Sequence, residues 1–262
     1  MARASLAASE KTPAFTPPMR IPRFYFPNSL TLGAGVVLPP HAAHHALRVL
    51  RLGENDPLRL FNGDGCEYSG RIVRLDKQGV MVLVESAAPL SSESPLDVLL
   101  VQGISSGERM DYTLQKSVEL GVGAIQPIEA ERSVVRLSGE RMLKRLQHWQ
   151  SVVASACEQS GRNIVPPVRP VMSLIDWLGA QDSGEALRIH LAPDAELSLR
   201  ELEKPAASVV LAAGPEGGFS DKEVGALQQH GFVGVKLGPR ILRTETAALA
   251  ALSALQILWG DY

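Results

Sequence analysis

The stretch VVLAAGPEGGFS, residues 209–220, predicts the core of the fold. Its apolar start predicts a buried strand, because a parallel strand covered on both faces is apolar throughout. The glycines at 214, 217 and 218 predict a turn whose backbone can approach a ligand closely. Ser220 and Glu223 then form the S-x-x-E pattern of a capping box, which fixes the start of a helix. On glycine content alone, a tight turn without a ligand is an equal alternative.

A second stretch, KLGPRILRTETA at residues 236–247, has the same plan. A strand ends at Gly-Pro, and an apolar helix follows with Thr244 as its expected N-cap. Arg240, Arg243 and Glu245 lie beside that cap. Two alternatives to a functional role remain open: Glu245 can stabilise the helix N-terminus, and Arg243 can pair with Glu216 or Glu245.

Strands and helices alternate along the chain from residue 97 onward. Gly121 and Gly161 are expected to end two of the helices. This alternation predicts an α/β fold with a mostly parallel sheet and helices on both faces. The expected strands are 97–103, 124–130, 186–192, 208–214 and 234–238, and the expected helices before residue 209 are 108–120 and 140–160.

The N-terminal part has a different pattern. Residues 41–52 suggest a helix with Ala43, Leu47 and Leu50 on one face. Short strands follow within 57–75 and 79–87, which together suggest a small β-barrel. The Pro- and Ser-rich segment 87–97 is the expected domain boundary, which gives domains at 19–90 and 95–262. Residues 1–18 are interpreted as a disordered extension, with Met19 an alternative start.

Composition narrows the possible functions. The net charge of −2 argues against wholesale wrapping of nucleic acid. Residues 19–88 contain eight Lys and Arg against six Asp and Glu, and residues 89–262 sixteen against twenty-one. This distribution suits local docking on phosphates, although ordinary surface scatter explains it equally well. Two cysteines without a CxxC motif predict neither a disulfide nor a metal site and fit a reducing cytoplasm. No apolar run is long enough to span a membrane.

The two glycine-rich stretches together resemble the paired cofactor loops of the SPOUT class of methyltransferases. Within that class the sequence is similar to the RsmE family, which methylates uridine N3 in 16S ribosomal RNA. Further matching segments are HHALRVLRLGEND, LFNGDG, QKSVELGVGAIQPIEAERSVV and ACEQSGRNIVPPV, so the resemblance covers nearly the whole chain from Met19. Ser117-Val118 in place of Ala-Thr and Asn55 in place of Gly are small departures.

The resemblance implies a PUA-like N-terminal domain that binds RNA and a C-terminal SPOUT domain with a trefoil knot. It also implies S-adenosylmethionine, held bent between three loops, as the cofactor. The implied cofactor contacts are Leu191, Ala192, Pro193, Leu211, Gly214, Pro215, Glu216, Gly217, Gly218, Leu237, Gly238, Ile241, Leu242 and Thr246.

On the substrate side, cations would meet RNA phosphates and uracil carbonyls. Arg243 is the first choice as catalytic residue and Arg132 the second. The candidate RNA contacts are Arg20, Arg23, His45, Arg48, Arg51, Lys116 and Arg162, although Lys116 can simply pair with Glu119. The implied partners are 16S ribosomal RNA, within an assembled or nearly assembled small subunit, and a second copy of the chain.

Other functional classes remain as alternatives. The enzyme could act on another RNA, or the chain could be a non-catalytic RNA-binding module with purely structural glycine turns. A nucleotide hydrolase would need Gly-Lys-Ser/Thr after the turn, where Phe219-Ser220 stands. A dinucleotide oxidoreductase would need GxGxxG in the first β-α unit, and the segment 97–110 lacks it.

Overall fold

The computed structural model describes residues 21–182 and 184–262. The expected disordered extension at 1–18, the alternative start at Met19, and Arg20 lie outside these residues. No helix in the described part is long and apolar enough to cross a membrane.

The strands are β1 Arg23–Tyr25, β2 Gly35–Val37, β3 Pro57–Phe61, β4 Cys66–Asp76, β5 Gly79–Pro89, β6 Asp97–Gly103, β7 Ala124–Glu129, β8 Met172–Ser173, β9 Leu187–Leu191, β10 Ser208–Ala213 and β11 Val233–Val235. The helices are α1 Pro40–His44, the π-helix η1 His45–Val49, α2 Glu108–Glu119, α3 Gly139–Ser160, α4 Leu174–Gly179, the 3-10 helix η2 Leu199–Glu201, α5 Asp221–Gln229 and α6 Thr244–Trp259.

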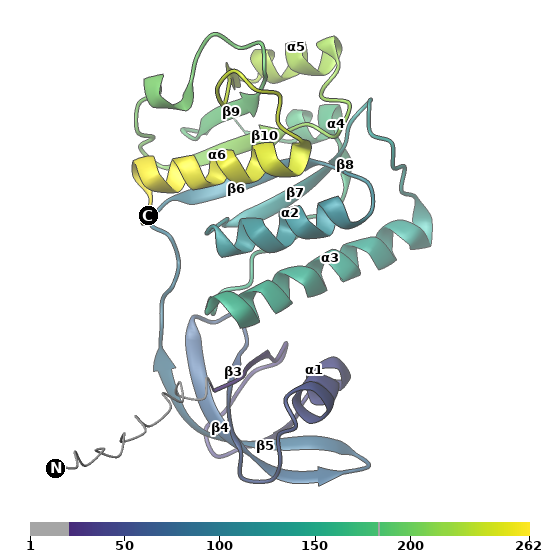
Figure 1. Cartoon of the computed structure of the whole chain (residues 1–262), viewed down its shortest axis with the longest axis vertical. Helices are drawn as coiled ribbons and strands as arrows, with labels where there is room; N and C mark the ends of the chain where they lie inside the picture. The colour runs from purple at the N-terminus through teal and green to yellow at the C-terminus, as the bar shows by residue number, and fades with distance from the viewer. Residues whose placement is uncertain (1–20, 183) are drawn as a thin grey trace, which may run out of the picture.

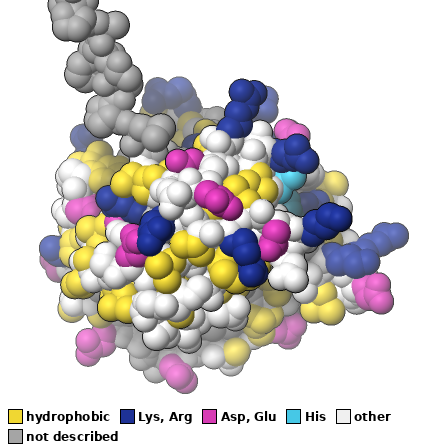
Figure 2. Space-filling model, turned by 90° about the horizontal axis from the view of Figure 1, so that it is seen from below, with side chains coloured by type: hydrophobic (Ala, Val, Ile, Leu, Met, Phe, Trp, Pro, Cys, Tyr) yellow, Lys and Arg dark blue, Asp and Glu magenta, His cyan; other side chains and the backbone are white. Residues whose placement is uncertain are grey.

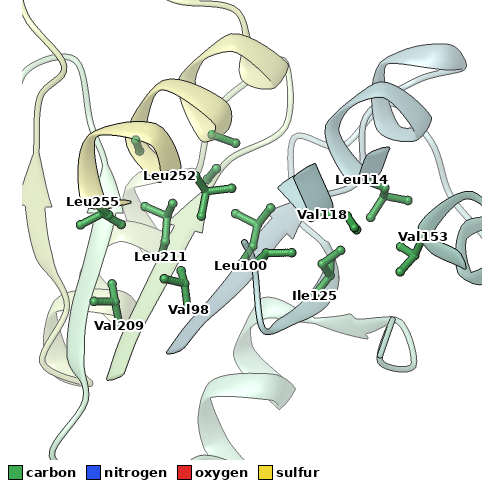
Figure 3. Packing of buried hydrophobic residues seen from close by; sticks show 14 of the residues in the cluster. Val98, Leu100, Leu114, Val118, Ile125, Val153, Val209, Leu211, Leu252 and Leu255 are labelled. Atoms are coloured by element: carbon green, nitrogen blue, oxygen red, sulfur yellow. The ribbon is translucent and has the colours of Figure 1, made fainter. Parts of the chain in front are cut away.

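The large domain is built on a six-stranded sheet of order β11-β9-β10-β6-β7-β8, in which every ladder is parallel. Helices α2, α3 and α6 pack on one face, where Leu114, Val153 and Leu252 meet strand residues such as Leu100 and Leu211 (Figure 3). Helices α4 and α5 cover the other face. The predicted parallel sheet with helices on both faces is confirmed.

The small domain is a five-stranded sheet of order β1-β3-β4-β5-β2 around its own core. Register shifts at Ser69/Gly70 and Ile72/Arg74 interrupt the long β4–β5 ladder, and such bulges bend a sheet. Gly63 and Gly65 take positive φ angles in the turn that joins β3 to β4, as the Asn-Gly-Asp-Gly motif predicts.

The expected helix at 41–52 differs from the structure. It is split into α1 and the π-helix η1, and Ala42 and Ala46 are buried in the core, while Ala43 of the predicted stripe is only partly buried against it. Leu47 and Leu50 are exposed instead. A π-turn holds an extra residue, so the apolar face rotates relative to ordinary α-helical spacing.

Helix α3 lies between the large sheet and the small domain (Figure 1). Its C-terminal end carries the expected glycine cap, since Gly161 has a φ of 90°. Arg23 of β1 reaches this end and donates to the carbonyl oxygens of Cys157 (2.9 Å) and Arg162 (3.2 Å). The two domains are therefore joined through buried polar contacts as well as through the chain.

Candidate functional site

A cavity of about 480 Å³ opens at the carboxyl ends of strands β9, β10 and β11. Three segments form it: residues 191–193 after β9, residues 213–219 after β10, and residues 235–247, which lead from β11 into α6. Ligands of open parallel sheets bind at this edge, where loops from neighbouring strands converge. The two glycine-rich stretches of the sequence thus meet at one site.

The β10 loop is held tightly on its inner side. A Cβ on Gly103, the last residue of β6, would lie 2.4 Å from the backbone nitrogen of Pro215. A Cβ on Gly214 would lie 3.1 Å from Gly218 across the turn. At its far end, Ser220 and Glu223 form the predicted capping box and start α5. The cavity floor is therefore fixed by close backbone contacts that only glycine allows.

At Gly217 a side chain is excluded by a neighbouring residue of the protein, Arg132. A Cβ there would lie 2.9 Å from the Cβ of Arg132, so the segment after β7 presses on the outside of the loop. The Arg132 guanidinium donates to the Phe219 carbonyl oxygen at 3.2 Å. Glu223 adds a further link by accepting from the Glu131 backbone N–H at 2.8 Å. These contacts brace the loop from outside the cavity.

Glu216 ties the same loop to the segment before α2. Its Oε1 accepts from the backbone N–H (2.9 Å) and hydroxyl (2.8 Å) of Ser106 and from Arg109 (3.2 Å). Burial alone would raise the pKa of Glu216, but the hydrogen bonds from Ser106 and Arg109 outweigh it and hold that pKa below its usual value. Glu216 is thus a charged anchor for the loop.

The start of α6 differs from the sequence expectation. Arg243 is the N-cap residue, and Thr244 is the first helical residue. The Thr244 hydroxyl donates to the Gly214 carbonyl oxygen at 2.5 Å and accepts from the Gln102 side chain at 3.1 Å. Thr244 therefore joins α6 to the β10 loop instead of capping its own helix.

Most of the predicted cofactor contacts line the cavity, but two do not. Leu211 is fully buried in the core under α6, and Thr246 faces a neighbouring hollow. The residues that do line it are Leu191, Ala192, Pro193, Gly214, Pro215, Glu216, Gly217, Gly218, Leu237, Gly238, Ile241 and Leu242. Sequence reasoning missed further lining residues, which are Arg109, Ala213, Phe219, Val235, Arg240, Thr244, Glu245 and Ala247. Several of these residues lie inside the two glycine-rich stretches, 209–220 and 236–247. Taking every residue of those stretches as a candidate would have found them.

The two candidate catalytic arginines have different surroundings. Arg243 lines the cavity, and among the described residues it forms no ion pair or hydrogen bond through its guanidinium. The alternative that it pairs with Glu216 or Glu245 is wrong: Glu216 pairs with Arg109, and among the described residues Glu245 forms no ion pair with Arg243. Arg132 lies outside the cavity lining and contacts the loop instead.

The candidate RNA contacts divide into exposed and buried groups. His45, Arg48 and Arg51 are exposed in and just after η1. Lys116 pairs with Glu119 at 2.7 Å, which is the alternative to an RNA contact that the sequence left open.

Arg23 and Arg162 differ from the expectation, because both are buried. Their side chains are 7% and 5% exposed. Arg23 pairs with Glu67, while Arg162 pairs with Glu93 and donates to the carbonyl oxygens of Val118 and Val122. Their donors are satisfied inside the protein, which corrects their assignment as RNA contacts.

Comparison with known proteins gives two family matches. The RNA methyltransferase domain family matches residues 92–256, and the RNA methyltransferase PUA domain family matches residues 38–85. The chain is 36% identical to ribosomal RNA small subunit methyltransferase E of Buchnera aphidicola subsp. Schizaphis graminum, over 92% of this chain and 98% of the relative. It is 35% identical to the protein of the same name from Bacillus subtilis, over 83% and 90% of the two chains.

Solved structures agree with these matches. A methyltransferase from Legionella pneumophila in complex with the cofactor SAM superposes with a TM-score of 0.89 at 41% identity, covering 93% of this chain and 100% of that one. Ribosomal RNA small subunit methyltransferase E from Neisseria gonorrhoeae, bound to S-adenosyl methionine, gives a TM-score of 0.85 at 44% identity with the same coverage.

Proposed function

The chain belongs to the RNA methyltransferase family that includes the ribosomal RNA small subunit methyltransferases E, and from that membership we propose that it methylates N3 of a specific uridine in 16S ribosomal RNA with S-adenosylmethionine. The observation that carries the proposal is the convergence of both glycine-rich loops on one cavity at the ends of β9, β10 and β11. A non-catalytic RNA-binding module would have no use for such a cavity.

The residues around the cavity suit this cofactor. Leu191, Leu237 and Leu242 give an apolar wall for an adenine ring, and the 214–218 turn offers backbone groups for polar edges. Ile241 is 87% exposed although it lines the cavity, so a bound ring would cover an apolar surface that otherwise faces water. When bound, the cofactor supplies an electrophilic methyl group on its sulfonium.

The protein's own contribution is to make N3 of uridine nucleophilic. N3 attacks readily only after it loses its proton, and the resulting negative charge spreads over the two flanking carbonyl oxygens. A fixed guanidinium beside those oxygens stabilises the anion and the transition state. We assign this role to Arg243, because it lines the cavity and its charge is not neutralised by a described partner.

The small domain is proposed to dock on RNA through the exposed residues His45, Arg48 and Arg51. Seen from the end of the molecule that this domain forms, Lys and Arg side chains are spread among hydrophobic and acidic ones (Figure 2). This mixture suits a local contact on a folded RNA surface. We therefore propose the assembled or nearly assembled small subunit as substrate, which would place the enzyme in the cytoplasm.

We also infer a trefoil knot and a homodimer. Strand β11 lies at one edge of the sheet, yet α6, which follows it, packs over β10 and β6 and beside α2. The connecting segment must cross β9 and β10, and on its way Lys236 pairs with the 197–198 segment. This crossing supports the knot. The exposed apolar residues Ile257 and Leu258 on α6 support a dimer through that helix.

Calorimetry with S-adenosylmethionine, ATP and NAD in parallel tests the cofactor assignment. We expect binding of S-adenosylmethionine alone. Mass mapping of small-subunit RNA from cells that lack the protein tests the substrate, and one uridine should lose its methyl group. Full methylation in the absence of the protein would overturn the proposal.

A further inference from the structure

The proposed reaction requires a group that accepts the proton from N3 of uridine. Among the described residues, the two acidic side chains that line the cavity are those of Glu216 and Glu245, and no histidine lines it. His190 is near in sequence, but it is buried, and its ring lies against Gly234, 3.1 Å from the point that a Cβ would occupy. Burial also lowers the pKa of His190. The acceptor is therefore sought among these two carboxylates, because Glu108 and Asp111 line only the adjoining hollow and not the cofactor cavity.

Glu216 is already engaged. Its Oε1 accepts three hydrogen bonds from Ser106 and Arg109, and these bonds hold the β10 loop against the start of α2. Taking up a proton would weaken each of these bonds, and its lowered pKa makes it a poor base.

In Glu245, Oε2 is buried and has no hydrogen-bond partner among the described residues. Oδ1 of Asp111 shares this property, but the other carboxylate oxygen of Asp111 is held by His148 at 2.7 Å. A buried carboxylate oxygen without a donor is costly, so a rotation of the side chain that brings this oxygen to a donor on the substrate is favourable. Glu245 and Arg243 both line the cofactor cavity at the start of α6.

A second hollow adjoins the cavity at this point. It has a volume of about 620 Å³, and it shares Arg109 and Glu245 with the cofactor cavity. Tyr112, which is half exposed, and Gln115 also line it. An aromatic ring can stack on a base, and an amide can bond to a base edge. Glu108 and Asp111 add acidic lining, which would repel a phosphate, and Arg109 supplies positive charge beside them.

We propose that Glu245 is the proton acceptor for N3 of the target uridine, with the uracil ring in the hollow beside Tyr112, a role that rests on the proposed function. The N3–H proton passes to the carboxylate of Glu245, and the electron pair of that bond stays on N3. N3 then forms the new N–C bond while the cofactor's sulfur keeps the electron pair of the broken C–S bond. The protonated Glu245 returns its proton to water after the product leaves.

The test uses the full-length protein with Glu245 replaced. Glu245→Gln should lower the single-turnover rate on small-subunit RNA at neutral pH by about a hundredfold, the usual size of a general-base contribution. The affinity for S-adenosylmethionine, measured by calorimetry, should stay unchanged. The loss should shrink as the pH rises, because hydroxide then ionises N3. RNA transcribed with 5-fluorouridine, whose N3 is more acidic, should restore part of the rate.

Chemical rescue separates the two neighbouring roles. Formate should partly restore Glu245→Ala, because a small carboxylate can occupy the truncated site, and it should not restore Arg243→Ala. Guanidinium should do the reverse. Glu203→Gln, which removes an exposed carboxylate far along the chain, serves as the matched control and should keep the parental rate.

A parental rate and pH profile in Glu245→Gln would overturn the proposal. So would lost cofactor affinity in both Glu245 variants, since it would show that the residue only supports the helix start. Failure of the parent enzyme to methylate small-subunit RNA would instead count against the proposed function itself.

Discussion

Arg243 is a free cation at a helix start, and its removal breaks no contact among the described residues. We expect Arg243→Ala to lower the rate at saturating RNA by about a hundredfold or more, because the uracil anion loses its counter-charge. Affinity for S-adenosylmethionine should stay nearly the same, since backbone and apolar groups are proposed to hold the cofactor. Single-turnover kinetics and calorimetry measure the two quantities.

The pH dependence of the Arg243→Ala variant distinguishes anion stabilisation from a structural defect. Raising the pH should recover part of the lost rate, because more uridine ionises without help. Arg200→Ala removes an exposed arginine from η2 and should retain the parental rate. A fully active Arg243→Ala enzyme, or one impaired equally at every pH, would contradict the assignment.

Cys157 gives a residue-scale prediction about thiol chemistry. Burial raises the pKa of its thiol to about 12, so the reactive thiolate is scarce at any pH below that value. At pH 8 a maleimide should therefore label Cys66 in the folded protein and leave Cys157 unmodified. Mass spectrometry before and after unfolding in guanidinium checks this, and rapid native labelling of Cys157 would refute it.

At the scale of elements, Arg23 joins strand β1 to the end of helix α3. Its guanidinium donates hydrogen bonds to Glu67 within the small domain and to the carbonyl oxygens of Cys157 and Arg162 within the large one. Arg23→Met would leave the carbonyl oxygens of Cys157 and Arg162 without this donor, and the buried Glu67 would keep only its pair with Arg59. We expect a loss of roughly 1–3 kcal/mol in unfolding free energy, measured by denaturant titration, because buried acceptors lose their hydrogen bonds.

A matched control for Arg23→Met comes from an exposed pair on the same sheet. Arg71 and Glu85 are ion-paired across β4 and β5 with both side chains largely in solvent. Arg71→Met should cost less than about 1 kcal/mol. Arg23 does not line the cavity, but it holds the small domain, which is proposed to dock on RNA, against α3; Arg23→Met should therefore weaken RNA binding more than cofactor binding. Equal stability losses for the two variants would argue against a special role for Arg23.

At the scale of the whole molecule, we predict a two-fold homodimer through α6. Ile257 is 65% exposed, and Leu258 beside it is also exposed. Light scattering at micromolar concentration should give twice the chain mass, and Ile257→Glu should give a monomer, because a charge cannot be buried there without a partner. A monomeric parent protein would disprove the dimer.

Sequence patterns predicted those parts of the fold that depend on neighbours along the chain. The capping box at Ser220 and the glycine cap at Gly161 are confirmed because each acts within a few residues. Thr244 was expected to cap α6. Its hydroxyl instead donates a hydrogen bond to the carbonyl oxygen of Gly214, thirty residues away in sequence. Arg23 and Arg162 look like surface cations in sequence, because nothing local reveals the buried carbonyls that bind them.

Positions around the cavity differ in which substitutions they can accept during evolution, and Gly103 is the most restricted of those described above. The apolar side chains of the cavity wall can exchange among Leu, Ile and Val, because such swaps roughly conserve volume. Residue 103 has no such freedom, since even one methyl group would meet the nitrogen of Pro215 at 2.4 Å. Any substitution there must displace the Gly214-Pro215 backbone, which lines the cavity. A single buried glycine, far from either loop in sequence, thus restricts which descendants of this protein can keep its chemistry.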